Sequence, residues 1–384
     1  MKKKITFLFM LSLAVTLTAC GNRNTATNDS AALQEETNSE LVEENQIPQN
    51  EAENATESTE ENTADASTLS AADGAGITTN GGDTIALSAL EHQQSGAEST
   101  VYYTSAITPE GLMAVYEALG VKLTGENIAV KLSTGEPPAS NYLDPNLIKD
   151  LVQSVNGTIV ECNTAYGGQR AETALHYQVA EDHGFTGIAD FEVMDEDGSV
   201  TIPVEGGTHF TENYVGAHFP EYDGFLVLSH FKGHAMAGMG GALKNISIGI
   251  ASAEGKSVIH TAGTSHDNPW GGEQDPFLES MAEAGKAVSD AKNGNMLYVN
   301  VLNRLSVDCD CDGNPAEPDM HDIGILISTD PIAVDQASVD LVYASPDNNT
   351  SLIERMESRN AYHVLEHGEA IGLGNRNYEL VNVE

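Results

Sequence analysis

Between Val101 and Glu384 the chain alternates between short apolar runs of strand length and amphipathic segments of helical period. Gly224–Ser229 is a continuous apolar run, which is typical of a strand buried on both faces of a parallel sheet. Asp275–Lys292 carries apolar residues at helical spacing, which predicts a helix that buries one face. This alternation predicts an α/β fold with a mainly parallel sheet and helices on both faces, built as one large domain or as two lobes.

Some local features are also predictable. A capping side chain followed by proline marks expected helix starts at Thr108-Pro109, Asp144-Pro145 and Asp330-Pro331. Phe191–Val204 has the pattern of a β-hairpin. Asp335 shares a helical face with Ser338 and can point inward, although capping or solvent exposure is the default for such a residue.

The N-terminus has the features of a targeting segment. A basic start precedes an apolar run, Ile5–Leu17, that is too short for an ordinary membrane span. The run ends in Leu17-Thr18-Ala19-Cys20, which resembles the lipobox of bacterial lipoproteins. The resemblance implies a signal peptide over residues 1–19, acylation of Cys20 (for example with palmitate), and anchoring in the lipid bilayer on the extracytoplasmic face of the bacterial cell membrane. An ordinary secretory signal with an incidental cysteine is the alternative.

Residues 20–100 have the composition of a disordered acidic linker. Asn, Thr, Ser, Ala and Glu dominate, large apolar residues are sparse, and Arg23 is the only Lys or Arg. Such a segment buries too little surface to offset its conformational entropy, so a tether before an α/β domain at 101–384 is expected. An acidic cation-binding tail is the alternative. The net charge of -41 argues against nucleic acid as a partner.

Three polar loops follow predicted strands directly. They are Ser133–Ser140, Asn163–Arg170 and His230–Asn245. Ligand sites of parallel sheets lie beyond the carboxyl ends of the strands, so these loops are expected to build one site.

The loop His230–Asn245 has the features of an anion site. From His230 to His260 the chain carries three lysines against one acid, Glu254. Glycines let backbone amides point at an anion while lysine supplies charge. The residues expected to hold a ligand or cofactor are Lys232, Gly238, Gly240, Gly241 and Lys244. In the alternative, the glycines only allow tight turns and the lysines lie in solvent.

His230 and His234 are candidates for acid–base chemistry or metal ligation. Histidines four residues apart can chelate a metal on a helix, but Gly233 favours a loop, where a pair of proton-carrying or anion-binding imidazoles is equally plausible. With Lys244 they are the expected catalytic residues. His260 could join them. Arg170 and Tyr166 offer a guanidinium and a hydroxyl to an anionic cofactor, unless Arg170 is simply exposed.

The run Asp308-Cys309-Asp310-Cys311-Asp312 is a candidate metal or redox site. Thiols one residue apart cannot easily form an unstrained disulfide with each other, but they can ligate one soft metal or an iron–sulfur cluster. Asp319, His321 and Asp322 lie close in sequence. In the alternative they are two small buried thiols. Cys162 is the only further thiol of the predicted domain, so a four-thiolate cluster within the chain is excluded.

Several motifs together resemble the domain-of-unknown-function family 362, whose members are often described as uncharacterised iron–sulfur centre proteins. They are HFKGHAMAGMGGALKN at 230–245, the loop 163–170, CDC at 309–311, DIGILISTDPIAVDQASVDL at 322–341 and IGLGNRNYEL at 371–380. The resemblance covers about residues 125–380. Many relatives carry a ferredoxin-like insert, but residues 261–275 hold no cysteine, so ferredoxin-type 4Fe-4S clusters are not expected. Residues 238–244 with the two histidines are also weakly similar to the lactate racemase family, which binds a nickel–pincer cofactor.

These features predict a surface-anchored α/β domain that binds a small anionic ligand or cofactor at 230–244. A metal-dependent or redox enzyme using Cys309 and Cys311 is the second hypothesis, and a non-catalytic solute-binding or adhesion lipoprotein is the third. The sequence leaves the metal, the reaction and the oligomeric state open.

Overall fold

The computed structural model describes residues 75–384. The expected signal peptide, the acylation of Cys20 and the linker up to residue 74 lie outside the described residues. The domain begins earlier than the expected boundary at 101, because β1 (Gly76–Thr78) and β2 (Thr84–Ala86) already form an antiparallel pair. The few apolar side chains of this polar stretch, such as Ile77 and Ile85, are buried, which anchors it to the domain.

The described residues belong to one compact unit, so the alternative of two lobes does not hold. Its main element is an eight-stranded sheet with the order β14-β3-β13-β12-β9-β4-β5-β6. The strands are β3 (Ser99–Thr104), β4 (Ile128–Lys131), β5 (Thr158–Glu161), β6 (Phe191–Val193), β9 (Gly224–His230), β12 (Met296–Leu302), β13 (Gly324–Ser328) and β14 (Tyr378–Asn382). Of these eight strands, β13 alone runs against the others, which confirms a mainly parallel sheet.

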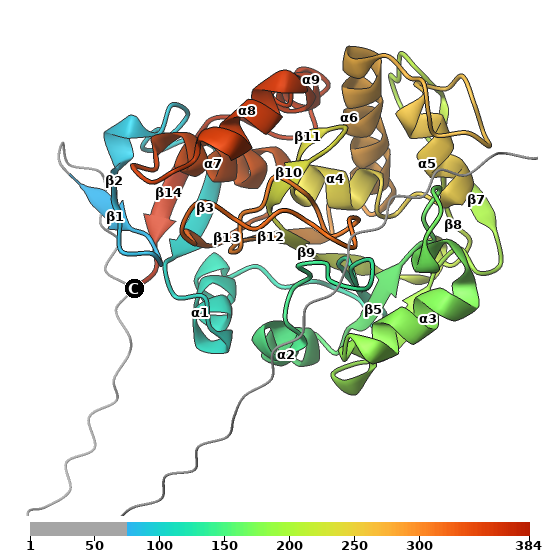
Figure 1. Cartoon of the computed structure of the whole chain (residues 1–384), viewed down its shortest axis with the longest axis horizontal. Coiled ribbons are helices and arrows are strands. Elements are labelled where there is room, and N and C mark those ends of the chain that lie inside the picture. Colours follow the sequence, from blue (N-terminus) through green and yellow to red (C-terminus); the bar gives the residue numbers. More distant parts are fainter. Residues whose placement is uncertain (1–74) are drawn as a thin grey trace, which may run out of the picture. The chain divides into compact units, whose positions relative to one another are not determined.

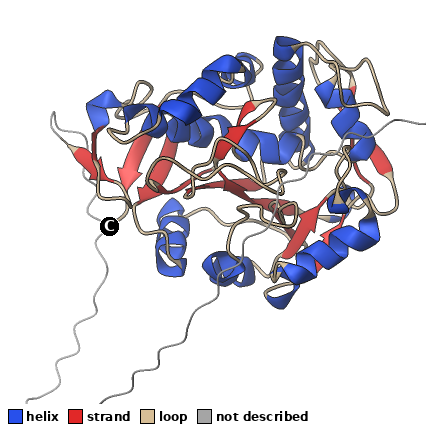
Figure 2. Ribbon diagram, viewed as in Figure 1, coloured by secondary structure: helices blue, strands red, loops and turns tan. Residues whose placement is uncertain are grey.

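Helices cover both faces of this sheet (Figures 1 and 2). They are α1 (Pro109–Leu119), α2 (Pro145–Ser154), α3 (Thr173–Asp182), α4 (Ala242–Ser247), α5 (Ala253–His260), α6 (Gln274–Ala291), α7 (Pro331–Ala344), α8 (Thr350–Ser358) and α9 (His363–Ala370). Among the described residues, none of the helices has the length and apolarity that crossing a membrane requires.

The central strand β9 shows why the sheet is buried on both sides. All seven of its residues are buried. Leu226 and Leu228 join the core cluster that contains α1 and α2, whereas Phe225 and Val227 join the cluster that contains α4, α6 and α7. Successive side chains of a strand point to opposite faces, so a continuous apolar run fills both layers.

The predicted helix starts are confirmed. Thr108 accepts a hydrogen bond from the amide of Gly111, Asp144 from Asn146, and Asp330 from Ile332 and Ala333, each with proline at the start of the helix. These caps satisfy amide groups that have no partner within the helix.

The predicted hairpin at 191–204 is wrong. β6 pairs in parallel with β5, while β7 (Ser199–Pro203) pairs with β8 (Glu212–Gly216). The turn between β6 and β7 is held by Asp195, whose carboxylate accepts the amides of Asn163 and Ala253. Alternation within one segment indicates a strand but does not identify its partner.

Candidate functional site

The loop after β9 folds into a small hairpin that leads into α4. β10 (Lys232–His234) pairs antiparallel with β11 (Gly238–Gly240). Gly238 has a φ of 78°, and a Cβ there would lie 2.6 Å from Cβ of Ala361. Gly238 therefore serves the turn and its packing, and it is not among the residues that line the cavity described next.

A cavity of about 320 Å³ lies at the carboxyl ends of β4, β5 and β9; we call it the edge cavity. The three loops predicted to form a site line it, together with the loop at 303–323. The remaining site residues expected from the sequence all line this cavity: Tyr166, Arg170, His230, Lys232, His234, Gly240, Gly241, Lys244, Cys309 and Cys311. The expectation that the strand ends converge on one site is thus met by the geometry.

The lining of the edge cavity is cationic in a strongly acidic chain. Five cationic side chains line it against two carboxylates, Glu161 and Asp310. The cations are Lys131, Arg170, Lys232, Lys244 and Lys256. Low-dielectric walls lined by one sign of charge concentrate counter-ions, so this cavity favours anions.

Lys244 differs from the other cations because its ammonium group makes no hydrogen bond or ion pair with any residue from 75 to 384. Burial, followed by the nearby charges of Arg170 and Lys131, lowers the pKa of Lys244 to about 8. The side chain is partly exposed to the cavity, so an anion bound there would supply the counter-charge that Lys244 lacks.

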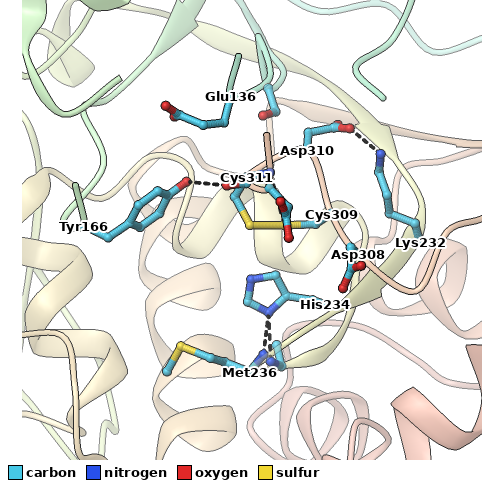
Figure 3. Close-up of a disulfide and its surroundings, with 12 residues drawn as sticks. Glu136, Tyr166, Lys232, His234, Met236, Asp308, Cys309, Asp310 and Cys311 are labelled. Carbon is cyan, nitrogen blue, oxygen red and sulfur yellow. Dashed lines mark hydrogen bonds and ion pairs between the residues drawn. A yellow bond between two sulfur atoms is a disulfide. The ribbon is translucent and has the colours of Figure 1, made fainter. Parts of the chain in front are cut away.

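The other cations have partners inside the protein. Lys232 forms an ion pair with Asp310, and burial would raise the pKa of Asp310, but Lys232 and His230 lower it to about 2. Figure 3 shows the two side chains facing each other. Lys232 therefore neutralises a buried carboxylate, which differs from the role in ligand binding expected for it.

Arg170 is also engaged. Its guanidinium contacts Glu136 at 3.2 Å and Glu161 at 3.4 Å, and it donates to the hydroxyl of Tyr166 at 3.2 Å. Tyr166 in turn donates to the carbonyl of Cys311 at 3.4 Å. Arg170 is 3% exposed, so the alternative of a solvent-exposed arginine is wrong. Its donors hold the loops together rather than remaining free for a ligand.

The amides at the start of α4 already bind an anion, the carboxylate of Asp335 on α7. Ala242 donates to Asp335 at 2.7 Å and Leu243 at 2.9 Å. Asp335 points inward, which was one of the two possibilities left open by the sequence. Gly241 therefore allows a close contact between α4 and α7, and these two amides are not available to a ligand.

The two histidines of the motif occupy different environments. Nε2 of His230 donates to the carbonyl of Asn303 at 2.6 Å, and Nδ1 lies 3.4 Å from Asp310. Nδ1 of His234 accepts the amides of Met236 at 3.2 Å and Ala237 at 2.9 Å. Burial lowers the pKa of both rings, aided by Lys232 for His230 and by Lys244 for His234. Each ring has one nitrogen committed to the backbone.

His260 also lines the edge cavity, at the C-terminal end of helix α5. Its Nδ1 bonds the carbonyl of Lys256 at 2.7 Å, and its ring stacks on Phe277. Burial lowers the pKa of His260 to about 4, so it contributes a neutral surface.

Cys309 and Cys311 form a disulfide with each other, contrary to the expectation from the sequence. Their Cα atoms lie 5.3 Å apart, within the range that a disulfide spans, because the chain turns sharply at Asp310. A ring nitrogen of His234 and the two sulfur atoms lie within 4.8 Å of one another (Figure 3). His321, expected near the cysteines, instead pairs with Asp83 and Asp347.

The cysteines of the described residues do not fit a four-thiolate cluster. Two are joined to each other, and the third, Cys162, is buried and donates its thiol to the carbonyl of Ile250. Burial raises the pKa of Cys162 to about 12, so it remains a thiol.

Sequence reasoning missed three charged residues of the site: Lys131, Glu161 and Lys256. Lys131 and Glu161 end the apolar strands β4 and β5, and their side chains lie 3.7 Å apart. Burial would raise the pKa of Glu161, but Lys131 and Arg170 hold it well below its usual range. A single charge at the carboxyl end of an apolar strand was the available signal.

The fold and site define an α/β domain with a cationic cavity at the carboxyl edge of its sheet. The chain belongs to the family described as Domain of unknown function (DUF362), whose sequence profile matches residues 128–340. This confirms the resemblance seen in the motifs, over a shorter range than the expected 125–380. None of the curated proteins compared with the chain matches it.

Two solved structures are distantly similar. The lactate racemase apoprotein from Thermoanaerobacterium thermosaccharolyticum is 15% identical with a TM-score of 0.32, over 59% of this chain and 55% of that one. A protein from Thermotoga maritima is 14% identical with a TM-score of 0.36, over 68% of this chain and 58% of its own. The chain thus spans little more than half the length of either structure.

Proposed function

We propose that this domain binds a small anionic ligand in the edge cavity. The observation that carries the proposal is Lys244, whose ammonium group has no partner among residues 75–384 and faces further cations across the cavity. Every other lysine or arginine of the lining is bonded to a carboxylate or to a backbone carbonyl. A bound anion supplies the counter-charge that Lys244 lacks.

The dimensions of the edge cavity suit a small molecule. Its volume of about 320 Å³ lies at the lower end of the range of ligand pockets. Apolar side chains, including Met236, Ile248 and Trp270, line it together with the charged groups. The ligand class supported by this lining is a small carboxylate or phosphate with an apolar portion.

The test compares ligand binding by the purified full chain and by Lys244→Met, which keeps the length of the side chain but removes its charge. Trp270 is the only tryptophan and lines the cavity, so its fluorescence reports occupancy. A panel of mono- and dicarboxylates and phosphate monoesters is titrated, with calorimetry on each hit. Loss of a charge-assisted contact should weaken binding by roughly ten- to a hundredfold.

Lys286→Met is the control, because Lys286 is paired with Asp290 on the surface of α6 and does not line the cavity. Unchanged affinity in Lys286→Met with weakened affinity in Lys244→Met supports the proposal. Equal affinity of all three proteins for every anionic hit overturns it.

We propose in addition that Cys20 is acylated and tethers the domain to the extracytoplasmic face of a bacterial membrane. The support is the sequence Leu17-Thr18-Ala19-Cys20 after a basic start and an apolar run. Metabolic labelling with a palmitate analogue should mark the wild-type chain and not Cys20→Ser. Equal labelling of both, or cleavage elsewhere with no label, overturns this proposal.

A further inference from the structure

The disulfide between Cys309 and Cys311 lies in the wall of the edge cavity, where a bound ligand would contact it. Only one residue separates the two cysteines, so the bond closes a very small loop. A disulfide stabilises a fold mainly by restricting the unfolded chain, and this effect is smallest for short loops. The position of the disulfide and the small size of the loop that it closes both argue against a purely structural role.

The two sulfur atoms are not equivalent. Cys309 is 8% exposed and accepts the amide of Cys311 at 3.2 Å, whereas Cys311 is more exposed. An N–H bond to Sγ of Cys309 stabilises negative charge that develops on that atom. Cys311 is therefore the sulfur open to attack, and Cys309 is the better leaving group.

The ring of His234 lies beside both sulfur atoms. Because its Nδ1 accepts two backbone amides, the proton of the neutral ring is on Nε2. A protonated Nε2 is a hydrogen-bond donor and not a metal ligand, since a ligating nitrogen must be free of its proton. The surroundings of Cys309 and Cys311 therefore favour a thiolate at these positions over a bound metal ion.

We propose that Cys309 and Cys311 form a redox-active pair that undergoes thiol–disulfide exchange with a small anionic thiol bound in the edge cavity. This inference rests on the proposed binding of anions there. Lys244 holds the anionic group of the thiol, and His234 donates a hydrogen bond to the thiolate that leaves.

The exchange balances with two thiols as the reductant. The first thiol loses its proton, and its thiolate attacks Sγ of Cys311; a new S–S bond forms as the Cys309–Cys311 bond breaks, and Cys309 leaves as a thiolate. A second thiol, also deprotonated, attacks the sulfur of the bound molecule and releases Cys311. Two protons and two electrons pass from the thiols to the cysteines, and the small molecule leaves as its disulfide.

The experiment measures the rate at which two thiols, 3-mercaptopropionate and 2-mercaptoethanol, reduce the oxidised Cys20→Ser protein at equal thiolate concentration. The reaction is quenched by alkylation, and mass spectrometry identifies the alkylated cysteines. We expect the anionic thiol to react roughly ten- to a hundredfold faster, because a cationic cleft concentrates it. In a Lys244→Met background this preference should disappear, whereas it should persist in Lys286→Met, whose lysine lies outside the cavity. Cys162 should remain unlabelled in the folded protein, as a buried thiol of raised pKa.

Propionate, which has no thiol, separates this inference from the proposed function. Cys309→Ser/Cys311→Ser should still bind propionate, as read from Trp270 fluorescence, and should lose the exchange. Propionate binding without any preference for the anionic thiol overturns the redox inference alone, and absence of both overturns the proposed function as well. Native protein with two free thiols at these positions, or with a metal bound to them, also overturns the inference.

Discussion

The carboxylate of Asp335 occupies the space that a side chain at Gly241 would need. A Cβ atom on Gly241 would lie 2.3 Å from Oδ1 of Asp335. The carboxylate cannot move away freely, because it accepts the amides at the start of α4. A glycine that the sequence suggested for ligand binding is thus required by contact between two helices.

Gly241→Ala is expected to lower the free energy of unfolding by about 1–3 kcal/mol, as an overpacked buried contact does. The matched control is Gly240→Ala, whose Cβ would meet nothing closer than 3.5 Å and should change stability by less than about 0.5 kcal/mol. Chemical denaturation of the three proteins checks this. Equal losses in the two variants would show that the Asp335 contact is not the cause.

Asp335 also predicts a dependence of stability on pH. Burial raises its pKa from 3.8 to about 6, while hydrogen bonds from Asn300 and the α4 amides oppose the shift. The folded protein then binds more protons than the unfolded chain in this window, so stability falls as the pH rises from about 4 to about 6, by about 3 kcal/mol. The difference in unfolding free energy between wild type and Asp335→Asn should follow this curve; a difference independent of pH would contradict it.

Loss of charge at Lys232 and at Lys244 should have different effects on the stability of the fold. Lys232→Met leaves Asp310 buried without a partner and should destabilise the fold by about 3–5 kcal/mol, with recovery in Lys232→Met/Asp310→Leu. Lys244→Met removes a charge that has no partner among the described residues, so stability without ligand should be unchanged or higher. Thermal and denaturant unfolding distinguish the two cases; a large loss in Lys244→Met would reveal an internal partner for it.

Anion affinity should fall above about pH 8. The pKa of Lys244 and that of Lys131 are both lowered to about 8, principally by burial, so both lysines lose their charge in the free protein as the pH rises. Linkage then weakens binding by up to about tenfold per pH unit for each proton taken up with the ligand. Calorimetry with propionate, which stays ionised throughout, measures this; a flat profile from pH 7 to about 10 would mean that neither lysine contacts the ligand.

The fold was predictable because apolar residues recur with different periods in its strands and in its helices. The apolar run 224–229 and the capped helix at Pro331 are each specified locally, and strand–helix alternation leaves few topologies. Strand pairing was less accessible. β6 and β7 are adjacent in the chain, yet each pairs with a different strand, since their partners are set by distant contacts.

The location of the site was predictable from the sequence, but the pairing of its charged and hydrogen-bonding groups was not. The strand ends identified most of the lining, because parallel strands bring their carboxyl ends together. Which lysine lacks a counter-charge depends on Asp310 approaching Lys232, and which amides are free depends on Asp335 approaching α4. The disulfide between Cys309 and Cys311 likewise depends on a turn that composition does not encode.

The reversed direction of β13 determines where residues 303–323 can run. If the strand after β12 were parallel to it, the chain would have to return to the opposite end of the strands before that strand could begin. Because β13 is antiparallel, it begins beside the point where β12 ends. The intervening segment therefore stays at the strand ends, where Cys309, Asp310 and Cys311 form part of the cavity wall while Leu305 and Ile323 anchor it in the core. A change at its cavity-facing positions is a route by which evolution, or a protein engineer, can alter what the domain accepts while the anchoring positions keep the scaffold intact.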